Sequence, residues 1–402
     1  MSKKYVLRDI GEIYDGPHAT PKRQTEGKYF LNISSLDNGR LQLRKSDHIS
    51  DIDYEKWTRR ITPQANDLLF SYETRLGEAA LMPGGIKAAL GRRMALLRPD
   101  TSKVDPGFLL YKWLSPQWQA LISERTLHGA TVNRIPIRDI PDWPITLPPL
   151  SQQNAIASIL RSLDDKIAGN NKMIRIILEL QKSIWIQNNV KNLSQIHLIN
   201  IAEPILGGTP KRSDNSLWNG DILWASVADM TSVSNSHLLT TAEQITEKAA
   251  ETKRFAPLPA GSVLLSARGT VGHVISLATP AAFNQSAYGF IAPKGYETAL
   301  RFAIEDTVEE LKSKSYGSVF STITKQQINE CLIPDVFNES FAELHAKLNS
   351  LETRVVIAEQ ENQTLARTRD ELLPLLMSGK ITVRDAEEAS AEVGVDKHEV
   401  EE

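Results

Sequence analysis

The chain has 402 residues and a net charge of −3, with 41% hydrophobic and 24% charged residues. Such a composition is typical of a soluble globular protein, and the length is sufficient for two domains. No apolar run reaches the roughly 20 residues of a membrane-spanning helix, and the first residues lack the apolar stretch of a signal peptide. The single cysteine, Cys331, excludes an internal disulfide and any multi-cysteine metal site. We therefore expect a cytoplasmic protein.

Acidic residues gather towards the end of the chain. Residues 384–402 hold eight Asp and Glu against Arg384 and Lys397, a net charge of −6 that leaves +3 for the rest of the chain. The segment has no aromatic residue and few large apolar ones, so we expect residues 382–402 to form an acidic, disordered tail. A charge near +3 on the remainder is compatible with nucleic-acid binding but does not demonstrate it.

Four sequence elements occur twice in the same order. The first, Thr20-Pro21-Lys22-Arg23, recurs identically as Thr209-Pro210-Lys211-Arg212. The other matches are residues 31–37 with 223–229, 67–71 and Gly77 with 262–266 and Gly272, and 129–140 with 317–328. The offsets between matching residues vary only from 188 to 195. Matches in constant order and at nearly constant offset indicate two copies of one domain.

Each copy has the pattern of a mixed α/β domain followed by a long helix. Short β-patterned runs broken by Gly, Pro and Asn come first, and a more helical stretch follows near residues 105–126 and 296–316. Long helices are predicted over 150–189 and 339–377. The expected organisation is a first domain over 1–147, a central helix over 148–190, a second domain over 191–336 and a C-terminal helix over 337–381, with the tail over 382–402.

Apolar residues in both long helices recur at alternating spacings of three and four, the pattern of a coiled-coil seam. We expect the helices, each about 38 residues and roughly 57 Å long, to pair with each other in antiparallel orientation. The predicted seam residues are Ile156, Leu160, Leu163, Ile167, Asn170, Ile174 and Ile177, then Phe341, Leu344, Leu348, Leu351, Val355, Ala358, Asn362, Leu365, Leu372 and Leu376. The alternative is a seam that only joins separate chains.

Three local expectations follow for these helices. Pro148-Pro149 should precede the first helix, and Pro374 with Gly379 should mark the end of the second. Gly169, which lies within the first helix, costs about 1 kcal/mol relative to alanine and allows a local weakness or bend there.

Motifs of the common nucleotide-dependent enzymes are lacking. The sequence has no G-x-x-x-x-G-K-[ST] phosphate loop, no strand-linked G-x-G-x-x-G and no Asn/Asp-Pro-Pro-aromatic motif of amino-methyltransferases. The histidines show no metal-ligand spacing, and the adjacent carboxylates Asp164 and Asp165 point about 100° apart on a helix, as solvated charges do. We therefore expect no catalytic residue, no metal site and no cofactor in this chain.

The duplicated loops carry residue types that suit DNA binding. Cations contact phosphates and fix position, whereas polar side chains read base edges. The predicted DNA-binding residues of the first copy are Thr20, Lys22, Arg23, Ser71, Tyr72, Arg75, Arg92, Arg93, Thr131, Asn133 and Arg134. Those of the second copy are Thr209, Lys211, Arg212, Ser266, Arg268, Thr270, Ser321, Thr322 and Lys325. The alternative interpretation is that the loops serve only as turns and that their cations are solvated.

Several motifs resemble those of one known family. Residues 147–153 (LPPLSQQ) with 162–167 (SLDDKI) resemble the central conserved region of type I restriction–modification specificity subunits. Residues 361–365 with 369–381 resemble the C-terminal conserved region, and 208–210, 221–224 and 268–272 resemble recurring elements of the target-recognition domains. The likeness covers residues 5–383. The first copy departs from the family's Gly-Thr-Pro, because Ala19 precedes Thr20-Pro21.

The resemblance implies two pseudo-twofold-related target-recognition domains of mixed α/β fold, separated by two long antiparallel coiled-coil helices. It implies sequence-specific binding of a bipartite site in double-stranded DNA, with no catalysis by this chain and no membrane partner. The implied partners are two methyltransferase subunits, which use S-adenosylmethionine to methylate adenine at N6, and restriction subunits that use ATP and Mg. The rival interpretations are a stand-alone DNA methyltransferase and a coiled-coil scaffold without DNA readout.

Overall fold

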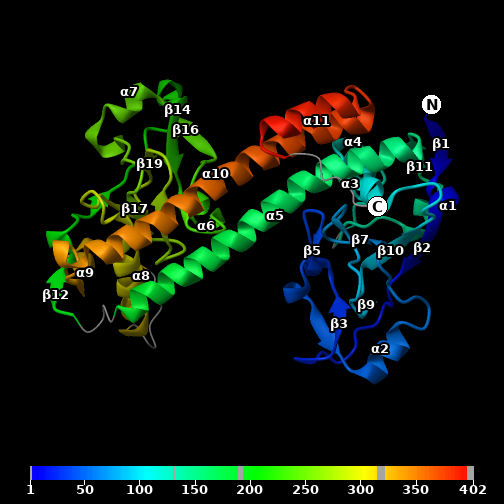
Figure 1. Ribbon diagram of the computed structural model, residues 1–402, viewed down its shortest axis with the longest axis horizontal. Coiled ribbons are helices and arrows are strands. Elements are labelled where there is room, and N and C mark those ends of the chain that lie inside the picture. The colour runs from blue at the N-terminus through cyan, green and yellow to red at the C-terminus, as the bar shows by residue number, and fades with distance from the viewer. Residues whose placement is uncertain (1, 130–131, 189–192, 315–321, 396–402) are drawn as a thin grey trace. The chain divides into compact units, whose positions relative to one another are not determined.

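The computed structural model describes residues 2–129, 132–188, 193–314 and 322–395, and it divides into two compact units (Figure 1). Unit 1 comprises Met1–Ile167 and Thr364–Glu402, and unit 2 comprises Ala168–Gln363. Two long helices, α5 (Leu150–Gln187) and α10 (Ala342–Ser378), contribute residues to both units. No helix in the described part of the chain is long and apolar enough to cross a membrane.

The first copy lies in unit 1. Its strands are β1 (Lys3–Val6), β2 (Gly11–Asp15), β3 (Lys28–Leu31), β4 (Leu36–Asp37), β5 (Arg40–Leu41), β6 (Asp47–Ile49), β7 (Leu68–Ser71), β8 (Ala79–Leu81), β9 (Ala88–Leu90), β10 (Met94–Pro99) and β11 (Pro144–Leu147). Its helices are α1 (Leu7–Ile10), α2 (Asp51–Trp57), α3 (Pro106–Leu114) and α4 (Pro116–Glu124). The sheets have the orders β2-β10-β7-β8, β6-β3-β9, β1-β11 and β4-β5.

The second copy lies in unit 2. Its strands are β12 (Gln195–His197), β13 (Ile205–Leu206), β14 (Trp218–Ala225), β15 (His237–Leu238), β16 (Glu243–Ile245), β17 (Val263–Ser266), β18 (Val274–Leu277), β19 (Ala281–Phe283), β20 (Ala287–Phe290) and β21 (Leu332–Pro334). Its helices are α6 (Val227–Ser232), α7 (Glu247–Ala250), α8 (Glu297–Lys314) and α9 (Lys325–Glu330). The sheets have the orders β13-β20-β17-β18-β15, β16-β14-β19 and β12-β21.

The two copies share one topology. The order β2-β10-β7-β8 matches β13-β20-β17-β18, the order β6-β3-β9 matches β16-β14-β19, and the pair β1-β11 matches β12-β21. Strand β3 runs antiparallel to β6 and parallel to β9, and β14 runs antiparallel to β16 and parallel to β19. A mixed sheet with the same order and the same directions in both copies confirms the predicted duplication of a mixed α/β domain.

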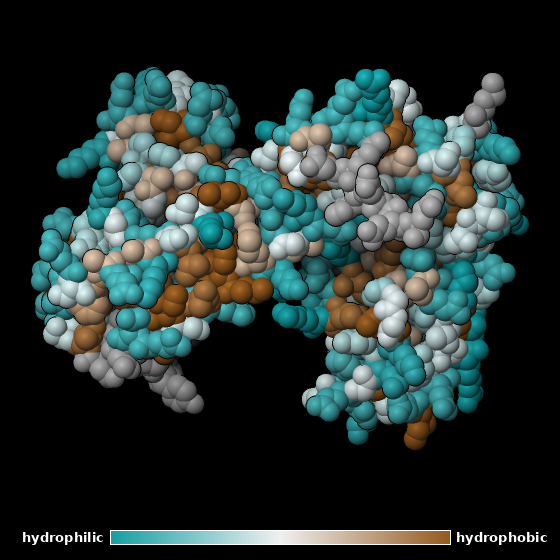
Figure 2. Space-filling view, in the orientation of Figure 1, coloured by the Kyte–Doolittle hydropathy of each residue, from teal (hydrophilic) through white to brown (hydrophobic). Residues whose placement is uncertain are grey.

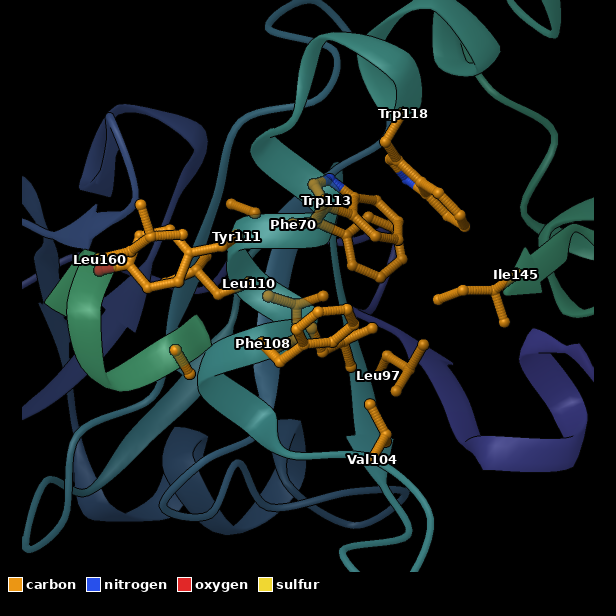
Figure 3. Close-up of a cluster of buried hydrophobic side chains, with 14 of the residues drawn as sticks. Phe70, Leu97, Val104, Phe108, Leu110, Tyr111, Trp113, Trp118, Ile145 and Leu160 are labelled. Carbon is orange, nitrogen blue, oxygen red and sulfur yellow. The ribbon is translucent and has the colours of Figure 1, made fainter. Parts of the chain in front are cut away.

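An aromatic cluster forms the centre of the core in unit 1. The ring centroids of Phe70 and Trp113 are 4.6 Å apart, and those of Trp113 and Trp118 are 5.5 Å apart. Figure 3 shows these rings packed between α3, α4 and the sheet. Helix α3 begins with Pro106, and the Asp105 carboxylate accepts a hydrogen bond from the Phe108 N–H, so a cap fixes where the aromatic face starts. Burial of such large rings contributes several kcal/mol each.

Helices α5 and α10 pair in antiparallel orientation, as predicted. In unit 1, Leu163 of α5 shares a core with Leu365 of α10. In unit 2, Ile174, further along α5, clusters with Val355, which lies earlier in α10. The early part of each helix therefore packs against the late part of the other, and Figure 1 shows the two helices side by side.

The structure buries most of the predicted seam. The buried members are Ile156, Leu160, Leu163, Asn170, Ile174, Ile177, Leu344, Leu348, Val355, Ala358, Leu365, Leu372 and Leu376. The half-buried members are Ile167, Phe341, Leu351 and Asn362. The two asparagines do not pair with each other. The Asn170 amide donates to the Glu361 carboxylate at 2.6 Å, and the Asn362 amide donates to Asn171 Oδ1 at 3.0 Å.

One local expectation about the helices differs from the structure. Pro374 lies inside α10, which continues to Ser378 and ends at Gly379 with φ 72°. Burial of Leu372 and Leu376 on either side of the proline offsets the roughly 3 kcal/mol that an internal proline costs. Helix α5 is continuous through Gly169, and a Cβ at this position would meet open space.

The prediction of a disordered tail is wrong for the residues next to α10. Helix α11 (Val383–Glu392) is capped by Thr382 and Asp385, whose side chains each accept a hydrogen bond from the other's backbone N–H. Ala386 is fully buried against the core of unit 1. Small apolar residues at helical spacing supply this packing face, although the composition of the tail is acidic. Residues 396–402 lie outside the described residues.

A carboxylate on α5 joins the first copy to both long helices in unit 1. Asp164 accepts hydrogen bonds from the Tyr111 hydroxyl on α3 at 2.7 Å and from the Arg369 guanidinium on α10 at 2.7 Å. Burial and the adjacent carboxylate raise the pKa of Tyr111 above its usual value. Asp165, by contrast, is 63% exposed. The expectation of two solvated charges therefore holds for Asp165 and is wrong for Asp164.

In unit 2, Glu352 on α10 corresponds to Asp164 and lies 188 residues after it in the chain. Its carboxylate accepts hydrogen bonds from the Gln181 amide at 2.7 Å and from Arg301 of α8 at 3.1 Å. His237 of β15 lies between Glu352 and Glu359, with its ring nitrogens 3.1 Å and 2.8 Å from the two carboxylates. Burial alone would raise the pKa of Glu352, but the Arg301 charge and the His237 contact outweigh it and lower the pKa to about 2.

The stability of unit 2 should depend on the protonation of His237. Burial lowers the pKa of His237, but the Glu352 and Glu359 carboxylates outweigh burial and raise the pKa to about 8. Because the folded state holds the proton more tightly than the unfolded chain, this contribution is present below pH about 6.5 and is lost as the pH rises through about 8. We expect the free energy of unfolding to fall by about 2 kcal/mol across that range.

Chemical denaturation at a series of pH values, followed by a signal from unit 2, measures this loss. The His237→Gln variant is the control, because it cannot titrate and its unfolding free energy should vary less over the same range. Equal pH dependence in the two proteins would contradict the assignment.

Candidate nucleic-acid interface

Two loops and a more distant segment meet in the first copy. They are the loop after β7, the turn over residues 91–93 between β9 and β10, and residues 132–135. The Tyr72 N–H donates to the Arg93 carbonyl at 3.2 Å, and the Ile135 N–H donates to the Tyr72 carbonyl at 2.8 Å. The Thr74 N–H donates to the Asn133 carbonyl at 3.2 Å. Backbone hydrogen bonds thus fix all three segments in one cluster.

The second copy repeats this arrangement with different side chains. The Ala267 N–H donates to the Ser286 carbonyl at 2.7 Å, and the Ile323 N–H donates to the Ala267 carbonyl at 3.0 Å. Ala267 and Ser286 therefore correspond to Tyr72 and Arg93 in the first copy. The predicted match of residues 129–140 with 317–328 places Ile323 opposite Ile135, and both donate the same hydrogen bond.

A common turn shapes the loops after β7 and β17. Gly77 (φ 81°) and Gly272 (φ 79°) adopt the left-handed conformation that favours glycine, at matching positions of the two hairpins. The Ser71 hydroxyl donates to the Glu73 carbonyl at 2.8 Å, and the Ser266 hydroxyl donates to the Thr270 carbonyl. The serines therefore hold the loop in shape from its first residue.

The loops that contain the repeated Thr-Pro-Lys-Arg begin close to the same cluster. A Cβ on Gly16 would lie 2.4 Å from the Gly91 carbonyl oxygen, and one on Gly207 would lie 2.3 Å from the Asn284 carbonyl oxygen. Only glycine permits so close an approach to the turns over 91–93 and 284–286. In the second copy the Thr209 hydroxyl also donates to the Gln285 side-chain oxygen.

Most of the predicted DNA-binding residues have exposed side chains. They are Thr20, Lys22, Arg23, Arg92, Asn133 and Arg134 in unit 1, and Lys211, Arg212, Arg268, Thr270, Thr322 and Lys325 in unit 2. Thr209 is half-buried, as are Arg75 and Arg93. Thr131 and Ser321 lie outside the described residues.

Four of the arginines already bind carboxylates of their own copy. Arg75 pairs with Glu78 at 3.1 Å, Arg93 with Glu73 at 3.1 Å and Arg23 with Asp47 at 3.3 Å. Arg212 pairs with Glu243, and its guanidinium lies 4.0 Å from the centroid of the Trp218 ring. These contacts orient the side chains and neutralise part of their charge, so the four arginines offer less positive charge to a ligand than unpaired cations do.

Three predicted contacts are corrected by burial. Ser71 and Ser266 are fully buried, and Tyr72 is 4% exposed. Burial raises the pKa of Tyr72 to about 12, so its hydroxyl stays protonated. Ser71 and Ser266 end β7 and β17, strands in which every residue is buried, and the Tyr72 hydroxyl is buried as well, so these side chains shape the loops and present no polar atom to DNA.

Two pairs of basic residues near the same loops were missed from the sequence. Arg59 and Arg60 follow α2 in the first copy, and Lys253 and Arg254 follow α7 in the second, and all four are exposed. Arg254 lies against Gly208, since a Cβ on that glycine would meet the Arg254 side chain at 2.8 Å. The sequence repeat could have predicted these two pairs, because a basic pair follows the strand and helix β6-α2 in the first copy and β16-α7 in the second.

The exposed side chains of these clusters are hydrogen-bonding and cationic groups. In the described ranges no group of three or more His, Cys, Asp and Glu side chains is arranged to hold a metal ion. The clusters offer guanidinium, ammonium, hydroxyl and amide groups on rigid backbone. Such groups bind phosphate oxygens and base edges.

Known proteins resemble the chain over nearly its whole length. The family model for the type I restriction modification DNA specificity domain matches residues 2–179 and 190–335. The putative type I restriction enzyme MjaX specificity subunit of Methanocaldococcus jannaschii is 23% identical over 412 residues, covering 94% of this chain and 93% of its own. The MjaIX specificity subunit of the same organism is 26% identical over 175 residues, 43% of this chain and 40% of its own.

A solved structure has the same fold. The type I restriction–modification system S subunit from M. genitalium superposes with a TM-score of 0.63 at 15% sequence identity. The superposition covers 94% of this chain and 96% of that one.

Proposed function

Because the chain belongs to the family of type I restriction modification DNA specificity domains, we propose that it reads a bipartite site in double-stranded DNA, one half with each copy. The observation that carries this proposal is the loop cluster that recurs in both copies with one backbone pattern and two sets of side chains. The shared backbone arrangement of the two loop clusters explains why both copies would bind DNA. Different side chains explain how they select different half-sites.

The role of a specificity subunit is not catalytic, and we propose that the reactions belong to partners. Two methyltransferase subunits would use S-adenosylmethionine to methylate adenine at N6, and restriction subunits would use ATP and Mg to cleave. Such a complex would act on DNA in the cytoplasm.

In unit 2, large apolar side chains are exposed on the long helices, namely Met173, Ile176 and Leu180 of α5 and Ile357 of α10. Figure 2 shows apolar surface on the visible face of this unit. This exposed apolar surface supports a role for the helices in docking the partner subunits.

The helix pair is proposed to set the spacer between the two half-sites. Each copy packs on the long helices through a partly buried polar contact, made by Asp164 in unit 1 and by Glu352 in unit 2. Half-sites one helical turn apart lie roughly 34–36 Å from centre to centre, a distance that helices of this length are able to span.

Exchange of the second domain tests the proposal. We expect replacement of residues 196–336 with the matching domain of another specificity subunit to change one half of the methylated site and leave the other half and the spacer unchanged. Long-read sequencing for N6-methyladenine, in cells that express the complete system, identifies both halves. A folded exchange protein that loses both halves, or that keeps both, would contradict independent readout by the two copies.

A further inference from the structure

The turns over residues 91–93 and 284–286 occupy one and the same place in the two copies. The Gly91 N–H donates to the Leu31 carbonyl at 2.7 Å, and the Asn284 N–H donates to the Ala225 carbonyl at 2.9 Å. Leu31 ends β3, and Ala225 ends the matching strand β14. The first residue of each turn is therefore held by the same hydrogen bond.

The last residue of each turn is fixed in the same way. The Arg93 carbonyl accepts from the Tyr72 N–H, and the Ser286 carbonyl accepts from the Ala267 N–H. With both ends of the turn matched, the residue between them is matched as well. Arg92 in the first copy and Gln285 in the second are thus structural equivalents, although neither belongs to a repeated sequence element.

Both side chains are exposed where the loops of the cluster meet. Each turn contacts the loop after β7 or β17 on one side, through Arg93 or Ser286, and the start of the Thr-Pro loop on the other, where Gly16 or Gly207 approaches. Arg92 forms no ion pair within the part of the chain that the structure describes. The positions are therefore central in the candidate interface, and their side chains are available for a ligand.

Arginine and glutamine are both able to read a purine by paired hydrogen bonds. An arginine fork donates twice, to O6 and N7 of guanine, whereas a glutamine amide accepts from N6 and donates to N7 of adenine. Guanine offers only acceptors at this edge and adenine offers one donor and one acceptor, so each side chain fits one purine and leaves the other mismatched.

We propose that Arg92 reads a guanine in one half-site and that Gln285 reads an adenine in the other, from equivalent positions in the two copies. This inference rests on the proposed function and adds the residue that selects a base in each half. In the second copy the Thr209 hydroxyl donates to the Gln285 oxygen, so Thr209 is a positioning residue. The oxygen retains a second lone pair for adenine, and the amide nitrogen retains its donors.

Interchange of the two side chains tests the assignment. The affinity of the complete complex is measured for its own site and for sites changed at each specified base in turn. We expect Arg92→Gln to lower the preference for one guanine of the first half-site by about 10- to 100-fold, without change in the second half. We expect Gln285→Arg to lower the preference for one adenine of the second half-site by a similar factor and to favour guanine there.

Conservative variants separate base reading from phosphate binding. Arg92→Lys keeps the positive charge but lacks the planar guanidinium that donates two hydrogen bonds to guanine. We therefore expect this variant to lose the guanine preference and to retain the salt dependence of binding. Gln285→Glu keeps the shape and loses the donor, and it should lose the adenine preference. Thr209→Val should weaken the same adenine preference and no other.

Matched controls use the same substitutions away from the loops. Arg8→Gln changes an exposed arginine that precedes β2, whereas the Thr-Pro loop follows the other end of that strand. Gln195→Arg changes an exposed glutamine in β12 of the second copy. Neither should alter the preference at any base.

Two results would overturn the inference. A uniform loss of affinity for all sites, with a reduced salt slope in Arg92→Gln, would show a phosphate contact. Base preferences that stay unchanged in both Arg92→Lys and Gln285→Glu would show that neither residue reads a base. Failure of the proposed function would look different, because the unaltered complex would then bind every DNA sequence equally.

Discussion

Replacement of Lys211 and Lys253 by glutamate is expected to weaken binding of the complete complex to its DNA site by about 100-fold at moderate salt. Lys211 lies in the repeated Thr-Pro-Lys-Arg loop and Lys253 in the short turn after α7, and both side chains are exposed. Each lysine that contacts a phosphate releases counterions when it binds, so its loss costs affinity in a salt-dependent way. Reversal of the charge adds repulsion to that loss.

Titration at several salt concentrations measures this effect. The slope of log affinity against log salt should fall by about 0.9 for each phosphate that is no longer neutralised, and so by roughly 2 in the double variant. The Lys294→Glu/Lys347→Glu protein is the matched control, since both lysines are exposed in unit 2 but lie outside the loop cluster. An unchanged slope in the first variant, or an equal fall in both, would remove this surface from the interface.

Removal of the buried charge at Arg301 should produce the largest loss of stability. Arg301 is 4% exposed and binds Glu352 and Glu305, at 3.1 Å and 2.9 Å. In Arg301→Met the Glu352 carboxylate stays buried beside Glu359 with less positive charge to balance it. Breaking a buried ion pair in this way costs about 3–5 kcal/mol, which we expect as the loss in the free energy of unfolding of unit 2.

Hydrogen exchange measured by mass spectrometry reports the two units separately. Peptides from α8 and from the early part of α10 should lose protection in Arg301→Met, whereas peptides from α3 and α4 should not. Tyr111→Phe provides a matched variant, because it removes the equivalent contact to Asp164 in unit 1 and costs only about 1 kcal/mol for one hydrogen bond. Comparable exchange in all four helices would show that the network does not stabilise unit 2.

The long helices could be predicted closely because their signal is local. Alternation of three and four between apolar residues defines a seam, and the structure buries the seams of α5 and α10 together, with Leu163 and Leu365 in one core and Ile174 and Val355 in another. The predicted seam ends too early within α5. Gln181 and Trp185 continue the buried face, but a polar and a bulky aromatic residue do not register as seam positions. Their burial depends on partners that lie far away in the sequence.

The candidate site was predictable in its loops and less so in its side chains. The repeated Thr-Pro-Lys-Arg and the paired glycines Gly77 and Gly272 mark loops that the structure brings into the candidate site. Residue type did not reveal that Tyr72 is buried or that Arg212 is held by Glu243. Gln285 was not predicted as a DNA-binding residue, because an isolated glutamine belongs to no recognisable motif.

The amino-acid sequence alone predicts a duplicated α/β domain with two paired long helices, and its motifs indicate the family. Periodicity and repetition are carried by neighbouring residues or by comparison of the chain with itself, so they need no coordinates. The three-dimensional arrangement is needed to learn which side chains face solvent, which charges pair inside each unit, and that Arg92 and Gln285 are at equivalent positions. These properties depend on backbone hydrogen bonds between segments distant in the chain, and the pattern of residues within any one segment does not encode them.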